Sequence, residues 1–155
     1  MTLRNPETEI AGPVLALDLG QKRIGVAVAD ELLIAISRLD PLRRSSWKQL
    51  LRDVAGLVRR FDARALVIGL PLNLDGSRGS AAREVEAAAK KFARSLPMPV
   101  YLQDERLSSV AAEERLRAEG YRSVDVAARV DGESAVIILR DFLTGGQERI
   151  VITGD

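Results

Sequence analysis

Three carboxylates stand out in this 155-residue chain, because each lies where a predicted secondary-structure element begins or ends. Asp18 ends the apolar run that starts at Val14, Glu105 comes just past a predicted strand, and Asp131 opens the predicted final helix. An ionised group at the end of a buried strand costs free energy unless something compensates it. If the fold brings these three carboxylates together, they must shift their pKa values or share cations. Oxygen ligands suit Mg²⁺ or Mn²⁺, so the pattern predicts a site for divalent cations.

Each acid also has a simpler interpretation when it is taken alone. Asp18 could hold only its own turn at Gly20. Asp131 is more often a helix N-cap, and Glu105 is more often a solvated residue at a rim. These structural alternatives stay open at the level of single residues.

The composition narrows the chemistry further. The chain contains no Cys and no His, which excludes disulfides, zinc–thiolate sites, Ser-His-Asp triads and imidazole acid–base catalysis. Any catalysis must therefore depend on carboxylates, Lys, Arg, Ser or a metal held by oxygen atoms. The net charge is only +1, so the chain as a whole is not positive enough to coat nucleic acid by electrostatic attraction. A local basic face is compatible with this balance.

The hydrophobic periodicity predicts a single α/β domain. Three strands, at 14–19, 23–29 and 33–39, read as an antiparallel meander separated by short turns. A capping box at Ser46 and Gln49 then begins a helix, and helices and strands alternate from there. The further elements expected are a strand at 64–70, a helix that ends at Pro97, a strand at 100–103, a weaker helix at about 108–119 and a final helix from about 131 to 143. We expect a mixed five-stranded sheet with helices on both faces.

The ends of the chain are expected to lie outside this domain. Residues 1–13 are predicted to form a flexible N-terminal arm, residues 14–144 the domain, and residues 145–155 a C-terminal tail that either pairs at a sheet edge or stays free. No run is long and apolar enough to span a bilayer, and the polar start is not a secretory signal. We therefore expect a cytoplasmic protein with no membrane partner.

Three stretches carry a resemblance to a known family. Asp18-Leu-Gly-Gln-Lys-Arg-Ile-Gly25, Gly69-Leu-Pro-Leu-Asn-Leu-Asp-Gly-Ser77 and Asp104-Glu-Arg-Leu-Ser-Ser109 resemble the signature stretches of the YqgF/RuvX family, from about residue 14 to residue 143. The resemblance implies an RNase H-like fold and a metal-dependent nuclease, a hydrolase acting on ester bonds. It implies either maturation of the 5′ end of precursor 16S rRNA or resolution of Holliday junctions in recombination and repair.

The resemblance also implies roles for the three acids. Asp18, Glu105 and Asp131 would form the metal-binding catalytic triad, and Asp18 would bridge two Mg²⁺ or Mn²⁺ ions about 3.5–4 Å apart. The third motif departs from the family, which tends to show two alanines where this chain has Ser134 and Ala135. The nearby Glu133 could support the metal or merely cap the helix.

Basic and polar residues near these acids are predicted to hold structured RNA or branched DNA. The predicted nucleic-acid contacts are Lys22, Arg23, Asn73, Arg78 and Arg106. The other basic clusters read as solvated helix faces; they are Arg43/Arg44/Lys48, Arg59/Arg60 and Lys90/Lys91/Arg94. Trp47 reads as a core anchor.

Two other function classes share some of these features. An ATP-using enzyme of the actin and sugar-kinase kind also has an Asp-x-Gly hairpin, but that architecture needs two such domains and the chain has no phosphate-binding P-loop motif. A non-catalytic nucleic-acid-binding module is disfavoured, because a binder gains nothing from three acids aimed at phosphate. A junction resolvase would act as a homodimer, since it must cut two symmetric strands, but the sequence shows no interface.

Overall fold

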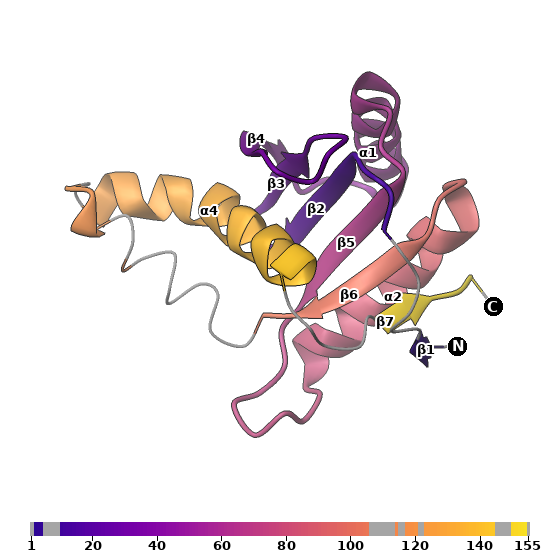
Figure 1. Ribbon diagram of the computed structural model, residues 1–155. Coiled ribbons are helices and arrows are strands. Elements are labelled where there is room, and N and C mark those ends of the chain that lie inside the picture. The colour runs from indigo at the N-terminus through magenta and orange to yellow at the C-terminus, as the bar shows by residue number, and fades with distance from the viewer. Residues whose placement is uncertain are drawn as a thin grey trace.

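A computed structural model describes residues 2–4, 10–105, 114, 117–120, 123–144 and 150–154; residues 2–4 and 123–132 are described by their backbone alone. The chain forms one mixed sheet with helices on both faces, which confirms the predicted α/β class (Figure 1). The strands are β1 (Thr2–Arg4), β2 (Val14–Leu19), β3 (Arg23–Ala29), β4 (Ile36–Arg43), β5 (Ala65–Leu70), β6 (Val100–Asp104) and β7 (Ile150–Ile152). The helices are α1 (Trp47–Phe61), α2 (Ser80–Ser95) and α4 (Ser123–Thr144). None of the described helices is long and apolar enough to cross a membrane.

The strand order is β1-β7-β6-β5-β2-β3-β4. Strands β2, β3 and β4 pair antiparallel in sequence, so the predicted meander is confirmed. Strands β2, β5 and β6 run parallel, so their carboxyl ends meet at one edge of the sheet. The sheet therefore brings together the ends of the two strands that lead to Asp18 and Glu105.

The sheet has seven strands where five were expected. The apolar tail segment Ile150–Ile152 pairs antiparallel with β6, and Thr2–Arg4 then pairs with that segment. Without β7, the outer edge of β6 would expose unpaired backbone groups, and an added strand satisfies them. Part of the segment expected to be a flexible N-terminal arm is thus a strand at the edge of the sheet.

Two element boundaries were predicted wrongly. Strand β4 begins at Ile36 rather than at residue 33, because the Asp30 Oδ1 atom accepts hydrogen bonds from the backbone N–H groups of Ile34 (2.8 Å) and Ala35 (3.3 Å) and so extends the turn. Helix α4 begins at Ser123 rather than near Asp131. Residues 123–130 carry alanines and valines at helical spacing. The interior glycine, Gly132, costs about 1 kcal/mol, which is too little to end a helix whose later residues pack on the sheet. The weaker helix expected at 108–119 lies largely outside the described residues.

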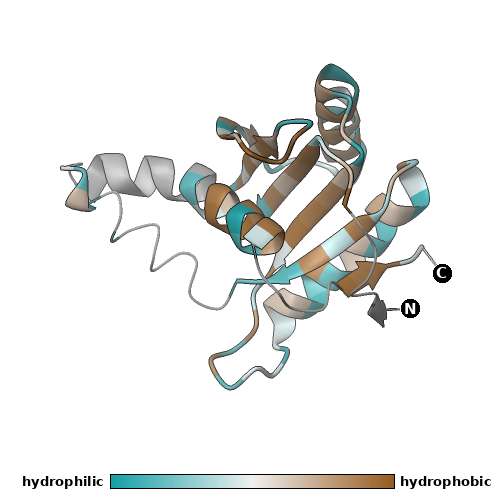
Figure 2. Ribbon diagram, viewed as in Figure 1, coloured by the Kyte–Doolittle hydropathy of each residue, from teal (hydrophilic) through white to brown (hydrophobic). Residues whose placement is uncertain are grey.

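Apolar side chains fill both faces of the sheet. Helices α1 and α2 cover one face and α4 crosses the other (Figure 1), while the strands between them are apolar along most of their length (Figure 2). Alternation along β2 sends Leu15 and Leu17 toward α1 and α2 and sends Val14 and Ala16 toward α4. This confirms the expectation that the central strands are covered on both sides.

Phe92 anchors the face that α1 and α2 cover. Its ring is fully buried and lies 4.7 Å, centroid to centroid, from the ring of Trp47, which is itself partly buried against the same core. We expect Phe92→Ala to lower the free energy of unfolding by about 3–5 kcal/mol, because the cavity adds to the lost transfer energy. Urea denaturation measures the change. Phe61→Ala, at a half-buried site at the end of α1, should cost less; equal costs would contradict this account of the core.

Candidate active site

Asp18 lies at the end of β2 on the side of the sheet that α4 covers. Ala16 and Val14, two and four residues earlier, belong to the apolar cluster under α4, and side chains two residues apart on a strand share a face. Asp18 is half-buried. The Gly20 N–H donates to the Asp18 carbonyl oxygen at 2.9 Å and closes the turn that follows. The Asp18 side chain therefore lies on the α4 side of the sheet, at its edge.

Glycines occupy the strand positions on both sides of Asp18. On β3 its register partner is Gly25. On β5 the register pairs Leu17 with Ile68, so the next residue, Gly69, lies beside Asp18 at the strand spacing of about 4.8 Å. Neither neighbour carries a side chain, and the space above the sheet next to Asp18 is kept clear of Cβ atoms.

The Glu105 carboxyl group fills part of that space. The Glu105 N–H donates to the Leu70 carbonyl oxygen at 3.0 Å, which continues the parallel ladder one residue past β6. A Cβ atom on Gly69 would lie 2.7 Å from Glu105 Cδ, 2.9 Å from Glu105 Oε2 and 2.5 Å from Ile138 Cδ1 of α4. The Glu105 carboxylate thus lies directly over Gly69, the β5 neighbour of Asp18. The structure brings these two predicted ligands together.

Strand alternation distinguishes Glu105 from its neighbour Asp104. Val100 and Leu102 of β6 belong to the cluster under α1 and α2, whereas Tyr101 belongs to the cluster under α4. By the same alternation, Asp104 lies on the face of Val100 and Leu102, and Glu105 lies on the face of Tyr101. Only Glu105 is therefore expected on the side of Asp18.

Asp131 occupies an interior position of α4. The interpretation of Asp131 as an N-cap is wrong, because the helix starts at Ser123. By helical periodicity Asp131 lies on the same stripe of α4 as Ile138, two turns earlier and about 10 Å along the axis. The Asp131 side chain and the whole of Arg106 lie outside the described residues, so their assigned roles stay predictions.

Glu133 has a different position and a different partner. It is only 7% exposed, and its Oε2 atom lies 3.5 Å from Nη1 of Arg38 on β4. It is about 200° from Asp131 around the helix. Because it is interior to α4, it does not cap the helix. Its ion pair with Arg38 ties α4 to β4.

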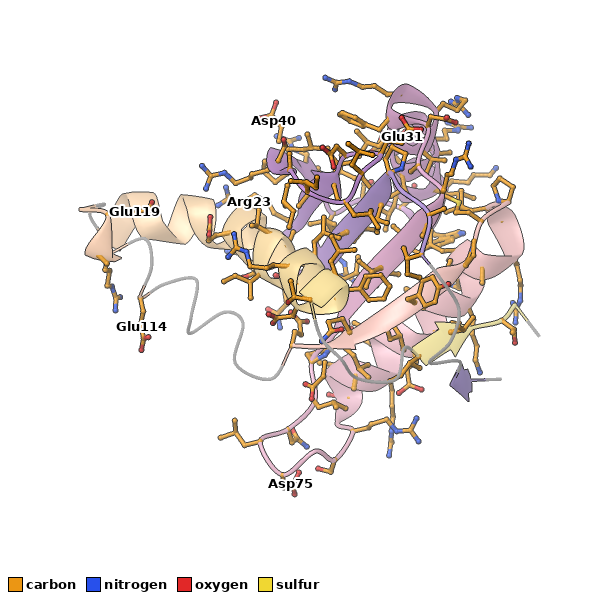
Figure 3. The ribbon with its side chains drawn as sticks, in the orientation of Figure 1. Arg23, Glu31, Asp40, Asp75, Glu114 and Glu119 are labelled. Atoms are coloured by element: carbon orange, nitrogen blue, oxygen red, sulfur yellow. The ribbon has the colours of Figure 1, made fainter. Side chains whose placement is uncertain are left out.

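Basic side chains border the carboxylates at the β2–β3 turn. Arg23 is exposed. By strand alternation it lies on the same face of β3 as Ala27 and Ala29, which belong to the cluster under α4, and Figure 3 shows it beside that helix. Its register partner on β4 is Arg43, which sequence reasoning had placed on a solvated face. Lys22 is exposed in the turn itself. Strand pairing, which single-residue patterns do not contain, is the signal that identifies Arg43.

The loop after β5 is cross-linked by its own polar groups. Asn73 Nδ2 donates to Ser77 Oγ at 3.0 Å, and the Ser77 N–H donates to Asp75 Oδ1 at 2.8 Å. Asp75 lies at the tip of this loop in Figure 3. Arg78 forms an ion pair with Glu86 of α2 at 2.9 Å. Asn73 and Arg78 are both exposed, but each already has an internal partner, and their contact with nucleic acid stays a prediction.

The donor set fits a hard divalent cation. Asp18 and Glu105 supply only carboxylate oxygens, which suits Mg²⁺ or Mn²⁺, and two glycines clear the space beside them. Among the residues with described side chains, no group of three or more acidic, His or Cys residues is gathered closely enough to hold a metal ion. The side chain of Asp131, the third predicted ligand, is not among those described.

Comparisons of the sequence agree on one family. The profile of the RuvX family, described as Holliday junction resolvase, matches residues 12–145. A protein of Anaeromyxobacter sp. (strain Fw109-5), named "Putative pre-16S rRNA nuclease", is 43% identical over 131 residues, which cover 84% of this chain and 96% of the relative. A relative of the same name from Syntrophus aciditrophicus (strain SB) is 38% identical over 138 residues, which cover 88% of this chain and 92% of the relative.

Solved structures show the same fold at low identity. RuvC of Thermus thermophilus matches with a TM-score of 0.55 and 15% identity, over 90% of this chain and 99% of RuvC. The Fowlpox virus resolvase, solved with Holliday junction DNA, matches with a TM-score of 0.51 and 14% identity, over 85% of this chain and 97% of the resolvase.

Gly69→Ala tests the carboxylate arrangement directly. The added methyl would meet the Glu105 carboxyl and Ile138 at less than 3.0 Å, so we expect the Glu105 carboxylate to be displaced and Mn²⁺ affinity to fall about tenfold or more, measured by isothermal titration calorimetry. Gly56→Ala is the matched control, because nothing lies within 4 Å of a Cβ atom there. Unchanged Mn²⁺ affinity in a folded Gly69→Ala variant would show that Glu105 does not contribute to the site.

Proposed function

The chain belongs to the RuvX family, and on that premise we propose that it is a metal-dependent nuclease that matures the 5′ end of precursor 16S rRNA. The observation that carries the proposal is the Glu105 carboxylate seated over Gly69, one strand away from Asp18. The RNA substrate is supported by relatives up to 43% identical that are named for it.

The proposed chemistry is phosphodiester hydrolysis that leaves a 5′-phosphate and a 3′-hydroxyl. Asp18, Glu105 and Asp131 would hold two Mg²⁺ or Mn²⁺ ions. When bound, such ions stabilise developing negative charge and make water a stronger nucleophile at neutral pH. Asp18 and Glu105 would hold the cations from strand ends, so the acids would need little reorganisation. No imidazole is required, in agreement with the absence of His.

The basic edge beside the acids would position the substrate. Lys22, Arg23 and Arg43 lie at the end of the β2–β3–β4 meander next to Asp18. Contacts from Lys and Arg to phosphates fix the register of a nucleic acid without reading its sequence. Carboxylates alone would repel the phosphate, so this neighbouring positive charge favours a polyanionic substrate.

A second candidate function is resolution of Holliday junctions. The description of the family profile favours it, and it would require a homodimer that presents two sites to two symmetric strands. A non-catalytic RNase H-like binding module is disfavoured by the paired carboxylates, which bind phosphate poorly unless cations are present.

Asp18→Asn and Glu105→Gln should each reduce cleavage of a precursor 16S rRNA fragment by about 10³-fold or more, because several kcal/mol of transition-state stabilisation depend on the bound cation. Product formation under single-turnover conditions in Mn²⁺ measures the rate. Asp104→Asn is the matched control, since its side chain is expected on the opposite face of the sheet. Equal losses in Asp104→Asn and Glu105→Gln would overturn the assignment of the site.

The choice of substrate is tested with one enzyme preparation and two labelled substrates. We expect cleavage of the precursor rRNA at its 5′ side and slower or no cleavage of a four-way DNA junction. Asp18→Asn should abolish either reaction. Cleavage of the junction alone, in symmetric pairs of nicks, would favour the resolvase function instead.

A further inference from the structure

A groove lies on the face of the sheet opposite the carboxylate site, where the end of β2 meets the start of α1 and the side of α2. Its volume is about 340 Å³. Arg44, Ser45, Glu84 and Lys91 supply its polar lining, and Leu19 and Trp47 supply apolar lining. None of these residues was assigned to the carboxylate site.

This groove and the carboxylate site share one turn of the chain. Leu19 follows Asp18 directly, and the two side chains leave the strand on opposite faces of the sheet. Arg44 Nη1 donates to the Gly20 carbonyl oxygen at 2.7 Å, and the Arg44 N–H donates to the Lys22 carbonyl oxygen at 3.2 Å. A nucleic-acid strand that extends from the carboxylate site over the turn at Lys22 would therefore reach Arg44 next.

Each basic side chain of the groove makes a contact within the chain. Arg44 is fixed by its bond to Gly20, and Lys91 Nζ lies 5.3 Å from the ring centroid of Trp47. Trp47 in turn packs on the buried Phe92. Cations that are already ordered lose less side-chain entropy when an anion binds.

The surrounding charge favours an anion. Arg44 and Lys91 each carry a positive charge and Glu84 carries the one negative charge, so the lining has a net positive charge. The first turn of α1, which borders the groove, contains no acidic residue, and the positive end of the helix dipole adds to the potential there. Lys91 lies over the Trp47 ring, which favours contact with phosphates over stacking of bases on the indole.

We propose that this groove binds the phosphodiester backbone of the substrate on one side of the scissile bond, so that the nucleic acid wraps over the β2–β3 turn from one face of the sheet to the other. The inference rests on the proposed nuclease function for the identity of the ligand. Its occupant is one nucleic-acid strand, contacted through phosphates by Arg44 and Lys91. The groove would add affinity without reading sequence.

The test measures binding separately from cleavage, in the Asp18→Asn background, with a fluorescein-labelled precursor 16S rRNA fragment and fluorescence anisotropy. Lys91→Gln should weaken binding about three- to tenfold. It should also reduce the slope of log K against log salt by about 0.7–0.9, the value for one lost phosphate contact. Lys91→Arg should restore most of the affinity.

The matched control is Arg59→Gln, which removes the same charge from an exposed position in the last turn of α1. It should change the affinity less than twofold, and thermal unfolding should show all variants folded. Equal effects of Lys91→Gln and Arg59→Gln on the affinity would overturn the proposal that the groove binds the substrate backbone. If the wild-type chain fails to cleave this RNA while Lys91→Gln still selectively weakens binding, the nuclease proposal fails and the groove stands.

Discussion

The crowding of two acids at one sheet edge is the constraint on which the candidate active site depends. The Glu105 carboxylate lies over Gly69, and Asp18 lies on the adjacent strand. Carboxylates gathered at one half-buried edge between a sheet and a helix favour a bound cation, because like charges disfavour each other's ionised form. The surrounding structure keeps them together, because the parallel pairing of β2, β5 and β6 brings all three carboxyl ends to the same edge.

Helix α4 closes this arrangement from above. Ile138 contacts the space over Gly69 beside Glu105, and the pair of Glu133 with Arg38 fixes the helix to β4. Small side chains on the sheet beneath it, such as Ala16 and Ala27, let the helix approach closely. The glycines and alanines on this face have a common role: they leave room for a helix and for carboxylates that larger residues would displace.

Much of the fold, including the position of Asp18 at a strand end, could be predicted from the sequence, because those signals are local. Asp18 ends an apolar strand before a glycine turn, and Ser46 caps α1 through a hydrogen bond from the Gln49 N–H at 3.2 Å, as the capping motif predicts. The failures are also physical. The start of α4 was missed because a glycine and an acid looked like a helix start, although α4 runs through both, since one interior glycine costs only about 1 kcal/mol. Edge strand β1 was not predicted, and for the segment that forms β7 the sequence allowed both pairing at a sheet edge and a free tail, because two three-residue segments have no periodicity of their own.

The sequence by itself determined the chemistry that is available and the family. A chain without His or Cys can offer divalent cations only oxygen ligands, and three local motifs are enough to indicate the family. Only the tertiary structure decided that Glu105 rather than Asp104 shares a face with Asp18, that Gly69 makes room for it, and that Arg43 lies across from Arg23. These facts depend on register between strands far apart in the chain. Because a shift of one residue moves every side chain of a strand to the other face, no local pattern can supply them.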